Sequence, residues 1–141
     1  MTLKNSQSVK YRRRRHSVFL LHAHLVFVTK YRRKVLTAEA LDLLKAVFEQ
    51  GCTEMGVCLE SFEGERDHVH LLVSYPPKLA VSELVNQLKG ESSRKLRKAQ
   101  PDIARRYWNG VLWSPSYFAT SCGGAPLALI RQYIEQQTRP A

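Results

Sequence analysis

Residues 18–28 read VFLLHAHLVFV, and this stretch decides the fold class. β-Branched and aromatic residues dominate it, and both kinds are enriched in strands. Because apolar residues occupy both alternating faces, the strand is expected at the centre of a sheet that is covered on each side. We therefore predict one strand from Ser17 to Thr29, whose apolar character is interrupted by His22 and His24.

The rest of the chain alternates between helical and extended patterns. Apolar spacing and turn residues predict these further elements: a helix capped by Thr37, strands over 57–63 and 68–75, a helix over 82–99, a strand over 113–121 and a helix over 126–138. The order strand, helix, strand, strand, helix, strand, helix is a split βαβ pattern closed by an extra helix. The predicted fold class is thus α+β with an antiparallel sheet.

Length and composition indicate a single globular domain. The chain has 141 residues, of which 44% are hydrophobic. Apolar runs stay short of the roughly 18 residues that a membrane span needs, and we expect no targeting peptide. Cys52, Cys58 and Cys122 show no CxxC spacing, which is typical of a reducing compartment. We predict a cytoplasmic protein.

Basic residues are in clear excess, with 22 Lys and Arg against 12 Asp and Glu and a formal net charge of +10. This balance favours a polyanionic partner, although solvated basic side chains without such a partner give the same count. Residues 1–16 end in a run of arginines and are predicted to be a flexible basic arm. The folded domain is expected over 17–138, with a tail over 139–141.

The segment His68-Val69-His70 is the first group of residues that suggests chemistry. Alternate residues of a strand point to the same face, so both imidazoles project together. Two neutral imidazoles suit a divalent metal, and Asp67 and Glu63 are near enough in the sequence to orient or neutralise the site. Unrelated histidines give the same pattern, however, and His22 and His24 repeat the spacing. The residues alone do not separate the two pairs.

The predicted last helix carries the second group. Tyr133 and Gln137 lie one turn apart and share a face. In one interpretation Tyr133 is a nucleophile that forms a covalent intermediate, and Gln137 is an oxygen ligand of the metal. In the other, Tyr133 is a half-buried residue that closes the core. Tyr117 is a rival nucleophile with apolar neighbours, and Gly123-Gly124 is predicted to be a hinge or a tight turn.

Together, four segments resemble the HUH single-tyrosine transposases of the smallest bacterial insertion sequences, often called the TnpA type. The U of HUH is a large apolar residue between two histidines. The segments are HLVFVTKYR (24–32), DHVHLL (67–72), LWSPSYF (112–118) and YIEQQ (133–137). The resemblance spans about residues 17–138. It does not include the SCGG of residues 121–124 or the long basic N-terminal arm, which depart from the family's pattern.

The resemblance implies a ferredoxin-like fold and a homodimer in which the tyrosine helix of one subunit can complete the site of the other. It also implies binding to hairpins in single-stranded transposon ends and cleavage through a 5′-phosphotyrosine at Tyr133. Mg²⁺ or Mn²⁺ would be held by His68, His70 and Gln137, which leaves His24 structural or close to DNA. The residues expected to contact DNA are Lys30, Arg32, Arg33, Lys89, Arg94 and Lys95.

Three alternatives remain open at this point. The first is a single-strand or RNA-binding module of the same fold without chemistry. The second is an inactive or domesticated transposase that only binds hairpins. The third is a zinc-dependent hydrolase that uses His68, His70 and a cysteine, with Cys52 and Cys58 as further candidates for a zinc site.

Overall fold

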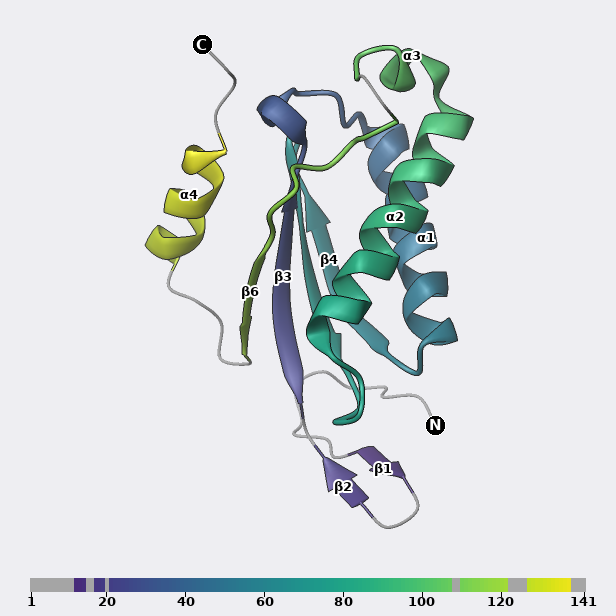
Figure 1. Cartoon of the computed structure of the whole chain (residues 1–141), viewed down its shortest axis with the longest axis vertical. Helices are drawn as coiled ribbons and strands as arrows, with labels where there is room; N and C mark the ends of the chain where they lie inside the picture. Colours follow the sequence, from purple (N-terminus) through teal and green to yellow (C-terminus); the bar gives the residue numbers. More distant parts are fainter. Residues whose placement is uncertain (1–11, 15–16, 20, 108–109, 122–126, 138–141) are drawn as a thin grey trace.

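The computed structural model describes residues 12–14, 17–19, 21–107, 110–121 and 127–137. Its elements are β1 (Arg12–Arg14), β2 (Ser17–Phe19), β3 (His22–Val28), η1 (Lys30–Arg32), α1 (Ala38–Glu54), β4 (Cys58–Gly64), β5 (His68–Ser74), α2 (Val81–Ala99), α3 (Pro101–Ala104), β6 (Phe118–Ser121) and α4 (Leu127–Gln136). Four strands form an antiparallel sheet in the order β4-β5-β3-β6. Helices α1 and α2 cover one face of this sheet, and α4 lies on the other (Figure 1). The predicted α+β fold with a split βαβ order is confirmed.

The main core fills the space between the sheet and the helices α1 and α2. Thr37 caps α1, because its side-chain oxygen accepts a hydrogen bond from the backbone N–H of Ala40 at 3.1 Å. The face of α2 that carries apolar residues at helical spacing points inward, and these residues of it are buried: Leu84, Val85, Leu88, Ser92 and Leu96. Helical spacing in the sequence therefore identified the buried face of α2 correctly.

A second, smaller apolar cluster lies on the opposite face of the sheet. Val26 and Val28 of β3 are fully buried there against Ile130 of α4. Phe118, Tyr133 and Ile134 pack around them. Because β3 buries residues on both faces, it is the doubly covered central strand that its sequence predicted. This cluster holds the tyrosine helix on the sheet.

The predicted strand over 17–29 is two strands, β2 and β3, in the structure. β3 pairs with β5 from His22 opposite Ser74 onward, and β5 ends at that residue, just before Pro76-Pro77. Proline has no N–H to continue a ladder, so the pairing stops. β2 pairs instead with β1, which means that Arg12–Arg14, predicted within a flexible arm, form a short strand.

The predicted strand over 113–121 is also shorter than expected. Only Phe118–Ser121 form β6, and Trp113 makes an isolated bridge to Thr29. The intervening segment contains Pro115, which cannot donate a ladder hydrogen bond. Residues 114–117 therefore form an irregular loop. The predicted hinge at Gly123-Gly124 and the predicted tail lie outside the described residues, and the last helix runs from Leu127 to Gln136.

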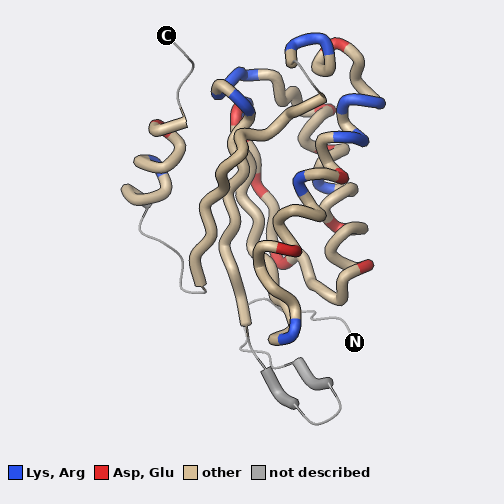
Figure 2. The backbone as a smooth tube through the Cα atoms, viewed as in Figure 1, with Lys and Arg blue, Asp and Glu red and all other residues tan. Residues whose placement is uncertain are grey.

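Basic and acidic residues are unevenly distributed among the elements of the fold. Lys and Arg gather around η1 and along α2, whereas several of the acidic residues lie on α1 (Figure 2). Across the described ranges, no helix combines the length and apolar composition needed to cross a bilayer.

Candidate active site

The register of the sheet places both histidines of the HxH segment on the face that α4 covers. His68 lies opposite Val28 and His70 opposite Val26, and these two valines pack against α4. Directly opposed residues of an antiparallel pair share a face. Val69 points the other way and is fully buried in the main core. The two imidazoles and the tyrosine helix therefore lie on the same side of the sheet.

Each histidine of the pair has a polar partner at its Nδ1 atom. The Nδ1 of His68 lies 2.8 Å from Oδ1 of Asp67, and the Nδ1 of His70 lies 3.2 Å from Nε2 of His24. The His68 and His70 rings meet edge to face, with centroids 4.9 Å apart. Asp67 thus orients His68, as its place in the sequence suggested. Glu63 lies opposite His70 in the register.

His70 is strongly disposed to stay neutral. Burial is the main cause that lowers its pKa to about 4, and the neighbouring His68 and His24 contribute smaller parts of the decrease. Burial also lowers the pKa of His24. A neutral imidazole has one nitrogen with a free lone pair, which is the form that binds a metal ion. The environment of His70 therefore keeps it in the form that a metal ligand needs.

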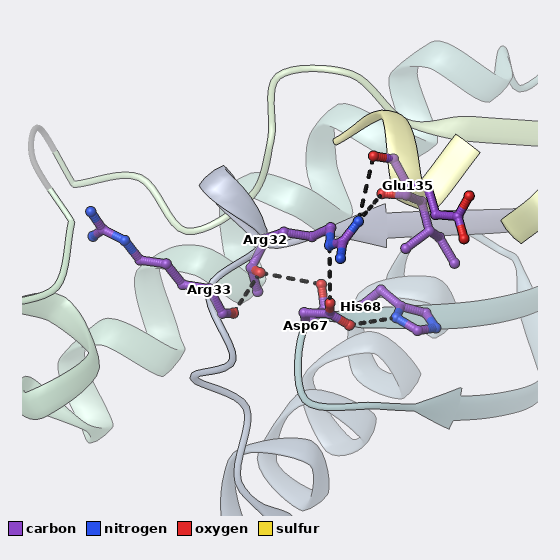
Figure 3. Close-up of polar contacts among 7 residues, drawn as sticks. Arg32, Arg33, Asp67, His68 and Glu135 are labelled. Carbon is purple, nitrogen blue, oxygen red and sulfur yellow. Dashed lines mark hydrogen bonds and ion pairs between the residues drawn. The ribbon is translucent and has the colours of Figure 1, made fainter. Parts of the chain in front are cut away.

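Arg32 joins the histidine pair to the tyrosine helix. Its Nε lies 3.5 Å from Oδ2 of Asp67, and its Nη1 donates to the backbone carbonyls of Ile134 at 3.5 Å and Glu135 at 3.4 Å (Figure 3). A cation at the C-terminal end of a helix satisfies free carbonyls and interacts favourably with the helix dipole. One guanidinium therefore contacts both the carboxylate that orients His68 and the last turn of α4.

The loop that carries Arg32 is strained. Tyr31 and Arg32 are consecutive non-glycine residues with positive φ, at 61° and 54°. Each such residue lowers the free energy of unfolding by roughly 1–3 kcal/mol, and it persists only where contacts with the surrounding structure enforce the conformation. Here the left-handed turn at η1 brings the guanidinium of Arg32 back toward Asp67.

Tyr133 is half-buried on the face of α4 that meets the sheet. Its hydroxyl lies 3.1 Å from Oγ of Ser116, and its ring packs beside Phe118 with centroids 5.7 Å apart. Burial raises the pKa of Tyr133, and the hydrogen bond with Ser116 offsets part of the increase. In the next turn, Oε1 of Gln137 accepts a hydrogen bond from the hydroxyl of Ser114.

Within the described part of the chain, neither Tyr133 nor Gln137 hydrogen-bonds to His68 or His70. The structure brings the four predicted residues to one face of the sheet. Hydrogen bonds from two serines hold Tyr133 of α4 and Gln137, which directly follows α4. Ser114 and Ser116 were missed by the sequence reasoning, which placed them in a strand. Their only sequence signal is that they flank Pro115, which argues against a regular strand.

Lys89, predicted to contact DNA, is engaged within the protein. Its half-buried ammonium donates to the backbone carbonyls of Ser114 at 2.7 Å, Pro115 at 3.2 Å and Ser116 at 3.3 Å. Burial lowers its pKa. Lys89 therefore supports the loop whose serines hold Gln137 and Tyr133. The sequence does not show this contact, because Lys89 and Ser114 are 25 positions apart.

The other predicted DNA contacts are placed in two groups. Around η1, the ammonium of Lys30 and the guanidinium of Arg33 lie over the ring of Tyr31. The guanidinium of Arg33 also lies over the ring of Tyr107. On α2, Arg94 is exposed and pairs with Glu91, and Lys95 is partly buried. The η1 group lies beside Asp67 and the histidine face, whereas α2 covers the opposite face of the sheet (Figure 1).

The described cysteines do not support a zinc site. Cys52 is buried in the main core, on the face away from His68 and His70. Burial and, to a smaller extent, the nearby Cys58 raise its pKa to about 12. Cys58 begins β4 opposite Ser74, at the far end from His70. No group of three or more His, Cys, Asp or Glu side chains in the described segments is arranged to hold a metal. A metal at this site would be bound by nitrogens of the histidine pair and by oxygen atoms of other groups.

Comparison with known proteins assigns the chain to a family. The family model described as "Transposase IS200 like" matches residues 17–137. The chain is 38% identical over 120 residues to the ISDra2 transposase TnpA of Deinococcus radiodurans, covering 85% of this chain and 86% of that protein. It is 32% identical over 114 residues to the transposase for insertion sequence element IS200 of Salmonella typhimurium, covering 81% and 74%.

Solved structures agree with the sequence comparisons. A crystal structure from Deinococcus radiodurans assigned to a transposase superposes with a TM-score of 0.82 at 36% identity, covering 92% of this chain and 99% of that one. A tyrosine transposase bound to a REP hairpin has the same fold, with a TM-score of 0.55 at 13% identity and coverage of 88% and 68%. The chain therefore belongs to the family of IS200-like transposases, enzymes that cleave DNA and transfer its strands.

Proposed function

We propose that this transposase binds hairpins in single-stranded transposon ends, cleaves one strand through a 5′-phosphotyrosine on Tyr133 and rejoins it by transesterification. The observation that carries the proposal is the shared face of the sheet. The register of β3 and β5 puts His68 and His70 on the side where α4 holds Tyr133. Arg32 spans the two parts of the site.

In the proposed cleavage step, the Tyr133 oxygen attacks the scissile phosphorus. A tyrosine–phosphorus bond forms, the bond from phosphorus to the 3′ oxygen breaks, the phenol loses its proton and the 3′ oxygen gains one. In the joining step a 3′-hydroxyl attacks a phosphotyrosine, and the phenol is regenerated. One phosphoester replaces another in each step, so no ATP is needed.

Family membership suggests a divalent metal requirement. We propose Mg²⁺ or Mn²⁺, with His68, His70 and Gln137 as ligands. The donor set fits: both imidazoles have Nδ1 engaged by a neighbour, and an amide oxygen has two lone pairs, so Gln137 can serve Ser114 and a cation together. Such a cation would polarise a phosphate oxygen and offset the charge that builds on it.

We propose that DNA approaches along the basic residues beside the histidine face. Lys30, Arg32 and Arg33 are the best placed, because η1 adjoins Asp67. Arg94 and Lys95 would extend the contact onto α2, whereas Lys89 acts on the loop that it supports. Residues 17–138 would be the catalytic domain, 1–16 a basic arm and 139–141 a tail. We place the protein in the cytoplasm, with the host's DNA.

We also propose a homodimer in which α4 of one subunit completes the histidine site of the other. Two features support this arrangement. In the single chain the Tyr133 hydroxyl bonds Ser116 rather than a histidine. The sequence also places Gly123-Gly124 just before α4, at a point where a change of chain direction costs little.

The test is covalent capture on a denaturing gel. Wild type, Tyr133→Phe and Tyr117→Phe are incubated with Mg²⁺ and end-labelled single-stranded DNA from the ends of the encoding element. We expect an adduct that survives denaturation in wild type and Tyr117→Phe and is absent from Tyr133→Phe. Binding without an adduct in any of them, across Mg²⁺ and Mn²⁺, would make the protein a hairpin-binding module without chemistry.

A further inference from the structure

Three imidazoles are in contact on the α4 face of the sheet. His68 and His70 come from β5, and His24 comes from β3. Ring centroids are 4.9 Å apart for His68 and His70, and 5.3 Å apart for His24 and His70. The proposed metal site uses only the first two histidines, and His24 belongs neither to the proposed ligands nor to the proposed DNA contacts.

The register explains why His24 reaches His70. His24 lies opposite Leu72, and His70 lies opposite Val26, so the two histidines are diagonal neighbours on adjacent strands. Side chains in this relation are within reach when they are long or aromatic. The result is a direct contact of 3.2 Å between Nε2 of His24 and Nδ1 of His70.

The proton positions decide what His70 can bind. A neutral imidazole carries one proton, so one of its nitrogens donates and the other accepts. Asp67 can only accept as a carboxylate, so Nδ1 of His68 holds the proton and Nε2 keeps its lone pair. For His70 the same outcome requires that His24 is the acceptor. If His24 donated instead, the proton of His70 would lie on Nε2 and block that atom.

We propose that His24 is a positioning residue: its Nε2 accepts the Nδ1 proton of His70 and so leaves the Nε2 of His70 free for a cation. The proposal rests on the metal site proposed above. It makes His24 the counterpart of Asp67, so that each histidine of the pair has one outer partner that sets its ring orientation and tautomer. Partners of this kind tune the affinity of a metal site.

The first test reads the tautomers of the histidines directly. The imidazole tautomers of metal-free, ¹⁵N-histidine-labelled protein are read from long-range ¹⁵N–¹H correlations at pH 8, with His24→Leu and His22→Gln as assignment and comparison variants. We expect the Nδ1–H form at both His68 and His70 in wild type. In His24→Leu we expect His70 to change to mainly the Nε2–H form. His70 already in that form in wild type would overturn the proposal.

The second test is metal affinity. Mn²⁺ titrations by calorimetry should show a loss of about 10–100-fold in His24→Leu. His24→Gln should recover most of it, because its amide oxygen can accept the same proton. His22→Gln is the matched control, since His22 precedes His24 on the same face of β3 and its described contacts include no other histidine. Unchanged affinity in His24→Leu would overturn the proposal.

The adduct assay, combined with the tautomer and Mn²⁺ measurements, distinguishes failure of the proposed function from failure of the positioning role. Tyr133→Phe should keep the wild-type tautomers and Mn²⁺ affinity. If wild type formed no DNA adduct but showed the expected tautomers and the loss in His24→Leu, the positioning role would stand and the covalent mechanism would fall. If wild type formed the adduct while His24→Leu kept the His70 tautomer and the Mn²⁺ affinity, only the positioning role would fall.

Discussion

Arg32 lies beside Asp67, with 3.5 Å between the guanidinium Nε and the carboxylate Oδ2, and the other oxygen of that carboxylate lies 2.8 Å from His68. The same arginine reaches the last carbonyls of α4. Sequence reasoning assigned Arg32 to DNA contact. The structure gives it a second task within the protein, which is to connect the orientation of His68 with the position of the tyrosine helix.

This relationship predicts that Arg32→Gln slows chemistry more than it weakens binding. Changes to residues that orient metal ligands typically cost 10–100-fold, and we expect a fall of about that size in the single-turnover cleavage rate at saturating DNA. Arg94→Gln is the comparison for the loss of a proposed DNA contact alone, because Arg94 is exposed on α2 and pairs only with Glu91 among the described residues. It should weaken binding without slowing cleavage at saturating DNA. An unchanged rate with weakened binding would instead make Arg32 a DNA contact alone.

Lys89→Met should destabilise the protein, because three backbone carbonyls of the 114–116 loop lose a charged donor. Hydrogen bonds to charged groups contribute about 1.5–3 kcal/mol, and two of these carbonyls belong to exposed residues that water can solvate. We expect a loss of about 2 kcal/mol, and a fall in Tm of roughly 5 °C or more for a chain of this size. Lys95→Met should change stability by less than about 0.5 kcal/mol. Equal melting temperatures would contradict the supporting role of Lys89.

The raised pKa of Tyr133 predicts a pH dependence for cleavage. Burial disfavours the phenolate, so the reactive form is scarce at neutral pH and increases as pH rises toward a pKa above 10. If the phenolate forms before attack, the single-turnover rate should rise up to about tenfold per pH unit from 7 to 9, without a plateau. Ser116→Ala should be slower at each pH, because the hydrogen bond that lowers the pKa is lost. A plateau near pH 7 would point to proton removal during attack.

Subunit sharing predicts complementation between two inactive variants. Tyr133→Phe and His70→Ala, carrying different affinity tags, are co-expressed and purified as heterodimers. If α4 acts on the partner's histidines, one site combines the intact tyrosine with an intact histidine pair, and adduct formation returns at about half the wild-type level for two equal, independent sites. Heterodimers that stay inactive, with unchanged hairpin binding, would indicate a site built within one chain.

Two glycines test the packing of the fold away from the chemistry. A Cβ added at Gly90, inside α2, would meet nothing within 4 Å, so Gly90→Ala should raise stability by about 0.5–1 kcal/mol through helix propensity. A Cβ at Gly64 would lie 2.5 Å from Cδ2 of Leu41 and 3.3 Å from Cγ1 of Val69, so Gly64→Ala should lower stability. Chemical denaturation measures both, and a stabilised Gly64→Ala would show that Leu41 moves aside freely.

Local sequence patterns determined the element types, the buried faces and the family. The continuous apolar run that ends at Val28, the alternation in residues 68–74 and the helical period of α2 depend only on neighbouring residues, because side-chain direction follows from backbone geometry. For the same reason the sequence predicted that the imidazoles of His68 and His70 project from the same face of their strand. It failed at residues 114–117, where Pro115 interrupts the strand pattern that surrounds it.

The tertiary structure decided which groups from different elements meet. The sequence could not separate His22 and His24 from His68 and His70 without the family resemblance, since both pairs have the same spacing. The register of β3 against β5 places His24 against His70, and the turn at η1 brings Arg32 to Asp67. Lys89 was likewise predicted only as a DNA contact, and its bonds to the 114–116 loop depend on how α2 packs beside that loop. Contacts between residues 25 to 103 positions apart depend on how the elements pack, and no local period encodes that packing.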